Sequence, residues 1–175
     1  YLQASLYAYK LEPSADAAVG CAAMAFKKGD IDGSVKFFDE AINLETDNAK
    51  KADNAYKAAS VLASAKKLSQ ARSYAQKAIS FNENFGAPYI LIAQLYAGNY
   101  KWNDEPALNK CTFFAAIDKL QRAKAVDPSV AEEANKLISS YSAYTPEAKD
   151  LFMLGYKAGD RITIGGWIGE TTTIR

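Results

Sequence analysis

The 175-residue sequence contains no histidine. This absence excludes Ser-His-Asp and Cys-His nucleophile systems and histidine-ligated zinc, and it removes the side chain most used for proton transfer near neutral pH. Carboxylate chemistry stays open in principle. However, the adjacent acids Asp39-Glu40 and Glu132-Glu133 would point in different directions on a helix and could not converge on one substrate atom. The sequence therefore predicts no catalytic residues, no metal ligands and no cofactor.

Cysteines and long hydrophobic runs are scarce. The two cysteines, Cys21 and Cys111, lie in apolar helical patterns, where a buried thiol is expected, and they fix neither a redox state nor a compartment. The longest uncharged stretch, residues 84–100, contains Gly86, Pro88 and Gly98, and indicates a buried helix rather than a membrane span. No signal peptide is visible, and the chain starts inside a helical pattern. We therefore expect a fragment of a longer protein, of unknown localisation.

Charge is balanced overall but not along the chain. Lysines and arginines number 21 and acids 20, for a net charge of +1, which argues against nucleic acid as a partner. Residues 14–47 carry three lysines against seven acids, a net of −4, whereas residues 49–84 carry seven basic residues against two acids, a net of +5. The pattern fits either two solvated helix faces or a field that orients a charged partner.

An internal repeat determines the expected fold. Small and apolar residues recur at helical spacing from Ala17 to Phe26, Gly29-Asp30 breaks the pattern, and a second helical pattern follows to Ile42. This stretch resembles the tetratricopeptide repeat (TPR) family, with small or aromatic residues at the positions where its helices touch: Ala22, Ser34, Phe38 and Ala41. The resemblance implies an all-α, right-handed solenoid of helical hairpins.

The pattern recurs along most of the chain. It implies repeat units at about 15–48, 52–85 and 86–129, an insertion at 98–108 in the third, and a terminal helix pair at 130–158. Residues 1–13 would be the second helix of a truncated preceding repeat. In the terminal pair, Ser129 and Glu132 match a capping box for a helix over 130–144, and a last helix is expected over 146–157.

The remaining residues, 159–175, differ in composition. β-Branched residues flank Gly165-Gly166, and their alternation predicts a short hairpin-like β tail. Degenerate repeats followed by GGWIGETT also resemble TPR proteins of bacterial cell envelopes, which implies a periplasmic or envelope location.

The TPR resemblance also implies a function. In that family the first helix of each unit lines a concave groove, and the corresponding positions here are mostly apolar and small. We expect a non-catalytic scaffold that binds a peptide or helix of an unidentified protein partner in this groove. The groove residues predicted to contact the partner are Phe26, Tyr56, Ser60, Ile90 and Gln94.

Two tryptophans are possible secondary contacts. Trp102 lies in the insertion, where it could anchor a partner or fold back on a neighbouring helix. Trp167 lies in the tail, where it could contact a ligand or cap the open end of the solenoid. The alternative function is a structural cell-envelope component with a self-filled groove that packs through its convex face or its insertion.

The sequence lacks the residues that one known TPR activity requires. The carboxylate clamp that captures the C-terminus of chaperone partners requires asparagine and basic residues at set positions. Those positions here hold Val19, Ala23, Lys57, Ala87 and Leu91. Only Lys57 is basic, so the sequence predicts no clamp.

Overall fold

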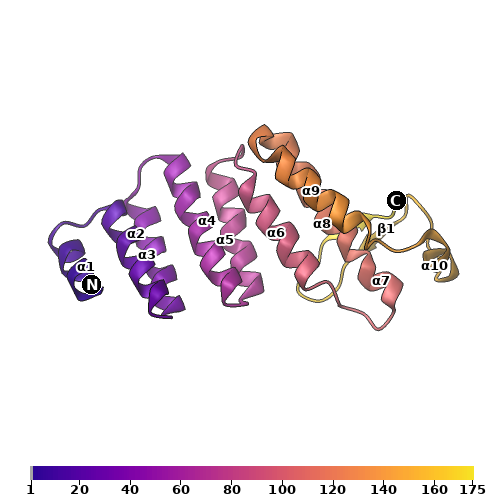
Figure 1. Cartoon of the computed structure of the whole chain (residues 1–175), viewed down its shortest axis with the longest axis horizontal. Helices are drawn as coiled ribbons and strands as arrows, with labels where there is room; N and C mark the ends of the chain where they lie inside the picture. The colour runs from indigo at the N-terminus through magenta and orange to yellow at the C-terminus, as the bar shows by residue number, and fades with distance from the viewer. Residues whose placement is uncertain (1) are drawn as a thin grey trace. The chain divides into compact units, whose positions relative to one another are not determined.

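The structure is a computed structural model that describes residues 2–175, and nearly all of its regular elements are helices (Figure 1). It divides into two compact units, which meet in the chain between Pro88 and Tyr89. No helix within residues 2–175 combines the length and apolar character needed to cross a bilayer.

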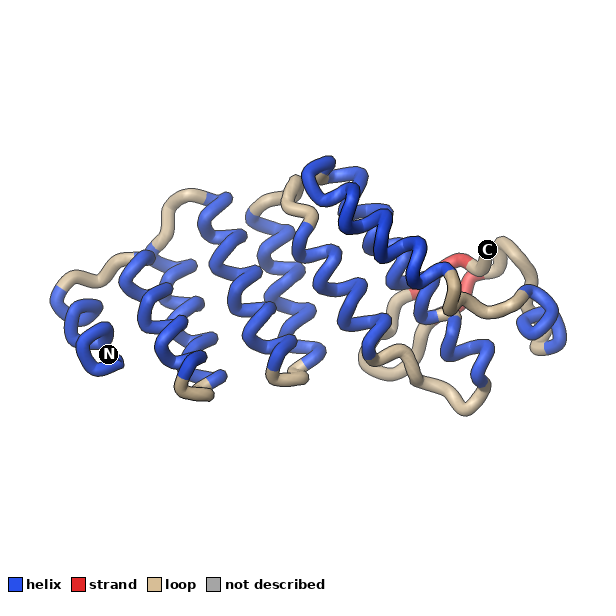
Figure 2. Tube along the Cα trace, viewed as in Figure 1, coloured by secondary structure: helices blue, strands red, loops and turns tan. Residues whose placement is uncertain are grey.

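The first unit consists of helices that pack side by side (Figures 1 and 2). In chain order they are α1 (Leu2–Leu11), α2 (Ala15–Lys27), α3 (Ile31–Leu44), α4 (Asn48–Ser64) and α5 (Leu68–Phe81). Helices α2 and α3 form one hairpin, α4 and α5 form another, and α3 packs against α4. The all-α class expected from the repeat pattern is confirmed.

Short polar side chains start three of these helices. Ser14 accepts a hydrogen bond from the backbone N–H of Ala17 at 3.1 Å, and Asp30 accepts one from Gly33 at 2.9 Å. Asp47 does the same for Lys50 at 3.0 Å. Each bond satisfies an N–H group that has no partner within the helix. Gly29, at φ +79°, supplies the left-handed backbone that reverses the chain between α2 and α3.

Small residues bring the two helices of the first hairpin close together. Ala22 and Ser34 are fully buried, and the Ser34 hydroxyl donates a hydrogen bond to the carbonyl oxygen of Ala22 at 2.9 Å. Phe38 packs on Ala22 and reaches α4 at Ala58. In the second hairpin, both helices carry several buried alanines, whose short side chains allow a close approach of helix axes. These alanines are Ala55, Ala59, Ala71, Ala75 and Ala78.

The second unit contains the remaining elements, apart from the first two residues of α6. They are α6 (Ala87–Gly98), α7 (Pro106–Lys110), α8 (Thr112–Val126), a 3₁₀ turn (Pro128–Val130), α9 (Ala131–Ser142), α10 (Ala148–Met153), β1 (Arg161–Thr163) and β2 (Thr171–Thr173). Helix α8 packs against both α9 and β2, so it is central to this unit (Figure 2).

The start of α9 differs from the sequence prediction. Asp127, rather than Ser129, is the capping residue: its Oδ1 atom accepts hydrogen bonds from the Ser129 backbone N–H at 3.1 Å and the Ser129 hydroxyl at 2.6 Å. The chain therefore makes a 3₁₀ turn, and α9 begins at Ala131 without a side-chain cap. The predicted capping box is wrong because residues 128–130 form the 3₁₀ turn, which puts Val130 rather than Ser129 at the N-cap position of α9. The last helix, α10, is also shorter than predicted.

The tail forms the predicted short β structure. Strands β1 and β2 pair antiparallel, with Ile162 opposite Thr172. The Thr172 hydroxyl donates to Asp118 of α8 at 2.6 Å, and Arg175 also forms an ion pair with Asp118. A second ion pair joins Lys119 to Glu170. Four buried isoleucines complete the contact, and the tail is thus part of the folded unit: Ile162, Ile164, Ile168 and Ile174.

Candidate functional site

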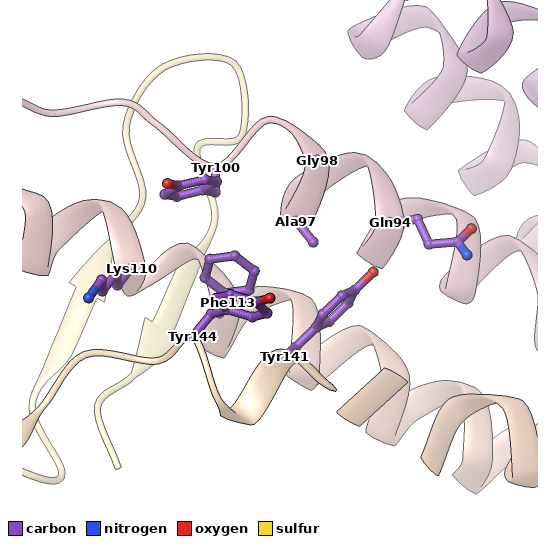
Figure 3. Close-up of a pocket in the computed structure, with 8 residues that line it drawn as sticks. All are labelled: Gln94, Ala97, Gly98, Tyr100, Lys110, Phe113, Tyr141 and Tyr144. Carbon is purple, nitrogen blue, oxygen red and sulfur yellow. The ribbon is translucent and has the colours of Figure 1, made fainter. Parts of the chain in front are cut away.

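A cavity of about 430 Å³ opens in the second unit (Figure 3). Its volume falls in the range of ligand-binding clefts, and most of its wall is aromatic or small. Helix α6 contributes one side, α9 with the turn after it contributes the other, and α7 and α8 complete it. The lining residues are Gln94, Ala97, Gly98, Tyr100, Lys110, Phe113, Tyr141 and Tyr144.

Four aromatic rings meet at one point of this wall. Phe113 is only 6% exposed and forms the centre. Its ring centroid lies 5.1 Å from that of Tyr100, 5.9 Å from that of Tyr141 and 5.5 Å from that of Tyr144, which is stacked on it. Aromatic pairs at these separations attract one another beyond their buried area. Tyr144 is 57% exposed, so much of the cluster's outer surface is open to solvent.

Polar groups lie at opposite ends of the cavity. The Gln94 amide is at one end and Lys110 is at the other, with the rings between them (Figure 3). Burial raises the pKa of Tyr141 above its ordinary value, so its hydroxyl stays protonated and can donate a hydrogen bond. Among the described residues, Lys110 forms no ion pair with an acid.

The insertion that carries Tyr100 is held in place by one buried asparagine. Asn109 Oδ1 accepts hydrogen bonds from the backbone N–H groups of Trp102 at 2.8 Å and Asn103 at 2.7 Å. Its amide nitrogen donates back to the Asn103 carbonyl oxygen at 2.6 Å. In addition, the buried Thr112 hydroxyl donates to the Tyr100 carbonyl oxygen at 2.8 Å. The loop is therefore fixed by specific hydrogen bonds, which position Tyr100 against Phe113.

Comparison with solved structures identifies the fold. The TPR2B domain of yeast Sti1, in a structure described as a pHsp70 complex, superposes with a TM-score of 0.57 at 23% identity, covering 74% of this chain and 96% of that one. The first TPR of Spaghetti (RPAP3), bound to the HSP90 peptide SRMEEVD, gives 0.55 at 16% identity, covering 74% and 94%. YrrB, described as a TPR protein with an unusual peptide-binding site, gives 0.55 at 21%, covering 88% and 73%.

The chain has the tetratricopeptide repeat fold. No protein-family model matches the sequence, and no curated protein matches it either. The TPR assignment made from Ala22, Ser34, Phe38 and Ala41 is confirmed at the level of the fold.

The predicted groove residues of the TPR array lie in different environments. Gln94 lines the aromatic cavity, whereas Ile90, on the same helix, is 4% exposed and belongs to the core. In the first unit, Phe26 is 42% exposed near the end of α2. Tyr56 is half-buried against Phe85, with ring centroids 5.4 Å apart, and the exposed Ser60 donates its hydroxyl to the Tyr56 carbonyl oxygen. For these three residues, contact with a partner stays a prediction.

Both tryptophans pack inside the second unit. The six-membered ring of Trp102 lies against Gly165, where an added Cβ atom would come within 2.7 Å of Trp102 Cε3. Trp167 packs edge-on against the buried Tyr96 of α6, with centroids 5.5 Å apart. Trp102 thus joins the insertion to the tail, and Trp167 joins the tail to α6. This arrangement explains why glycine is needed at position 165.

The aromatic wall of the cavity was not identified from the sequence. Tyr100, Phe113, Tyr141 and Tyr144 come from three separate segments, and Lys110 belongs to a short helix with no counterpart in the repeat pattern. One signal was present, because Tyr141 and Tyr144 are spaced three apart near the end of a helix. That spacing alone is more typical of core packing than of a binding site.

The cysteines and the basic segment offer no second candidate site. Cys21 and Cys111 are buried free thiols, and burial raises the pKa of both, that of Cys111 to about 11. A thiol so protected is a poor nucleophile at neutral pH. Within the described part of the chain, no group of three or more side chains is placed to hold a metal ion. In the basic segment, Lys57 pairs with Asp53 and Lys67 pairs with Asp32, which reduces its free positive charge.

Proposed function

We propose that this TPR protein is a non-catalytic scaffold that binds a peptide or helical segment of another protein, and that the aromatic cavity of the second unit is its principal contact site. The observation that carries the proposal is the open ring cluster itself. Phe113 supplies a rigid floor, whereas Tyr144 and Gln94 are exposed at the surface. Rigid aromatic side chains beside exposed polar groups are typical of interaction hot spots.

The similar structures support this class of function. Two of them hold chaperone-derived partners or peptides by their titles, and a third is described by its peptide-binding site. This chain lacks the side chains of the carboxylate clamp, having Val19, Ala23 and Ala87 at three of its positions. We therefore propose a different mode of peptide binding, based on aromatic packing at the α6–α9 side of the second unit.

The position of the tail favours a binding site over a self-filled one. Residues 161–175 pack on α8 through Asp118, Lys119 and Phe114, and none of them lines the aromatic cavity. The C-terminal segment thus contributes to the stability of the unit while the cavity stays accessible. For this reason we favour an open binding site in this cavity over one filled by the chain's own tail.

A peptide-display selection against the whole chain tests the proposal. We expect selected peptides to bind the unmodified protein saturably and to lose at least about tenfold in affinity for Tyr144→Ala, since removal of a hot-spot aromatic costs 2 kcal/mol or more. Tyr144 is exposed, so this variant should fold. The matched control is Tyr7→Ala, which removes a tyrosine of the first unit that is 68% exposed.

The proposal fails if no displayed peptide binds. It also fails if the selected peptides bind Tyr144→Ala and Tyr7→Ala as tightly as the unmodified chain.

A further inference from the structure

One end of the aromatic cavity carries a lysine, Lys110, that pairs with no acid among residues 2–175. Lys101 does not line the cavity: it lies in a separate polar depression with Asp104, and its ammonium nitrogen is 6.0 Å from the centroid of the neighbouring Tyr100 ring. Within residues 2–175, neither lysine forms an ion pair. Asp104 and Glu105, which belong to the same insertion, are exposed and pair with neither of them.

Aromatic rings attract both cations and other aromatic side chains, and the nearby positive charge decides which of the two this cavity favours. A cation would gain from the ring faces, but Lys101 already lies over Tyr100, and a second cation would be repelled by both lysines. An aromatic side chain gains from the ring cluster without that repulsion. The rings around Phe113 are inclined to it by 27°, 42° and 60°, so they offer both faces and edges to an entering ring.

The polar groups at the two ends of the cavity can bind the parts of a peptide that flank an inserted aromatic side chain. The Gln94 amide can both donate to and accept from a peptide group. Lys110 is exposed on a five-residue helix and can pair with a carboxylate that flanks the inserted ring. The two ends therefore match a peptide that crosses the cavity with its aromatic side chain inserted between them.

We infer that the cavity selects an acidic segment of a partner protein in which an aromatic residue is flanked by Asp or Glu. The aromatic ring packs on Phe113 and Tyr144, and a flanking carboxylate pairs with Lys110. This inference rests on the proposed function, because it names the kind of peptide that the same site takes.

Three blocked heptapeptides test the inference by fluorescence-detected or calorimetric titration of the whole chain. Their central residues are Glu-Phe-Glu, Lys-Phe-Lys and Glu-Ala-Glu in an identical Gly-Ser context. We expect the first to bind about tenfold more tightly than the second, because the attraction between Lys110 and the flanking carboxylate is replaced by repulsion between two cations. The third should show no saturation, since it lacks the ring.

Charge reversal on the protein supplies the matched test. Lys110→Glu should cancel most of the preference for Glu-Phe-Glu over Lys-Phe-Lys, and it should weaken the salt dependence of Glu-Phe-Glu binding. Lys50→Glu makes the same change of net charge on the first turn of α4, at an exposed position, and should leave the preference intact. Both sites are exposed, so thermal unfolding should confirm that both variants are folded.

The inference is overturned if Lys-Phe-Lys binds as tightly as Glu-Phe-Glu, or if Lys110→Glu leaves the preference unchanged. It is also overturned if none of the three peptides binds while a displayed peptide does. After any of these results, the proposed function is still supported if displayed peptides bind the unmodified chain and lose affinity for Tyr144→Ala. If no displayed peptide binds, the proposed function and the inference fail together.

Discussion

Tyr74 shows how a single side chain joins two repeats of the first unit. Its hydroxyl lies 2.8 Å from both carboxylate oxygens of Asp39, and so connects α5 to α3. Burial, followed by the hydrogen bond and the negative charge of Asp39, raises the pKa of Tyr74 to about 12. Each of these effects disfavours the phenolate relative to the phenol. The bond is therefore a stabilising contact over the whole neutral range.

We expect Tyr74→Phe to lower the free energy of unfolding by about 1 kcal/mol at neutral pH, because one hydrogen bond to a half-buried carboxylate is lost. Since the folded pKa is raised, this contribution is complete below the ordinary tyrosine pKa of 10.0 and disappears as pH rises towards about 12. Denaturant unfolding at several pH values measures it. Tyr7→Phe, at an exposed position, should change stability little at any pH.

At the scale of elements, the insertion and the tail depend on a few close contacts. Asn109 organises the insertion through three hydrogen bonds, and Gly165 of the tail accommodates the ring of Trp102. Neither contact belongs to the repeat pattern. The first contact fixes the loop that carries Tyr100, and the second joins the tail to that loop.

Asn109→Ala should release the insertion. The backbone N–H groups of Trp102 and Asn103 lose their acceptor, and we expect a loss of stability of about 1–3 kcal/mol. Amide hydrogen exchange should accelerate for residues 101–105, and peptide affinity should fall because Tyr100 is no longer fixed. Asn84→Ala, an exposed asparagine of the first unit, is the control. Unchanged exchange in the insertion would show that Asn109 does not organise it.

Gly165→Ala should separate the tail from the insertion. The new methyl group would clash with Trp102, and overpacking of this kind costs about 1–3 kcal/mol. Tryptophan emission and thermal unfolding report the change. The control, Gly20→Ala, adds a methyl group at an exposed helical site with no neighbour within 4 Å, and should stabilise by up to about 1 kcal/mol. Equal melting temperatures for the two variants would contradict the assigned contact.

At the scale of the whole molecule, local sequence patterns predicted the helices better than the site. The contacts of Ala22, Ser34 and Phe38 follow from a short-range periodicity, and they are found in the structure. Asp127 shows the limit of such reasoning, because two capping patterns overlap and only the competing hydrogen bonds decide between them.

The cavity depends on contacts that are distant in sequence. Gln94 was predicted from its repeat position, and the structure places it on the cavity wall. Ile90 comes from the same reasoning but is buried, since packing around one helix decides which positions stay open. Phe113 meets Tyr141 and Tyr144 only because α8 and α9 pack together, and Tyr100 joins them only through the folded insertion. The spacing of the repeats does not predict these contacts between aromatic rings.

The most direct test of the account is to locate a bound peptide on the chain by amide chemical-shift changes during titration with a display-selected peptide. The account predicts the largest changes in residues 94–113 and 141–144, with small changes along α2 and α4. Changes concentrated on α2 and α4, or on the tail at residues 161–175, would contradict the claim that the aromatic cavity of the second unit is the binding site.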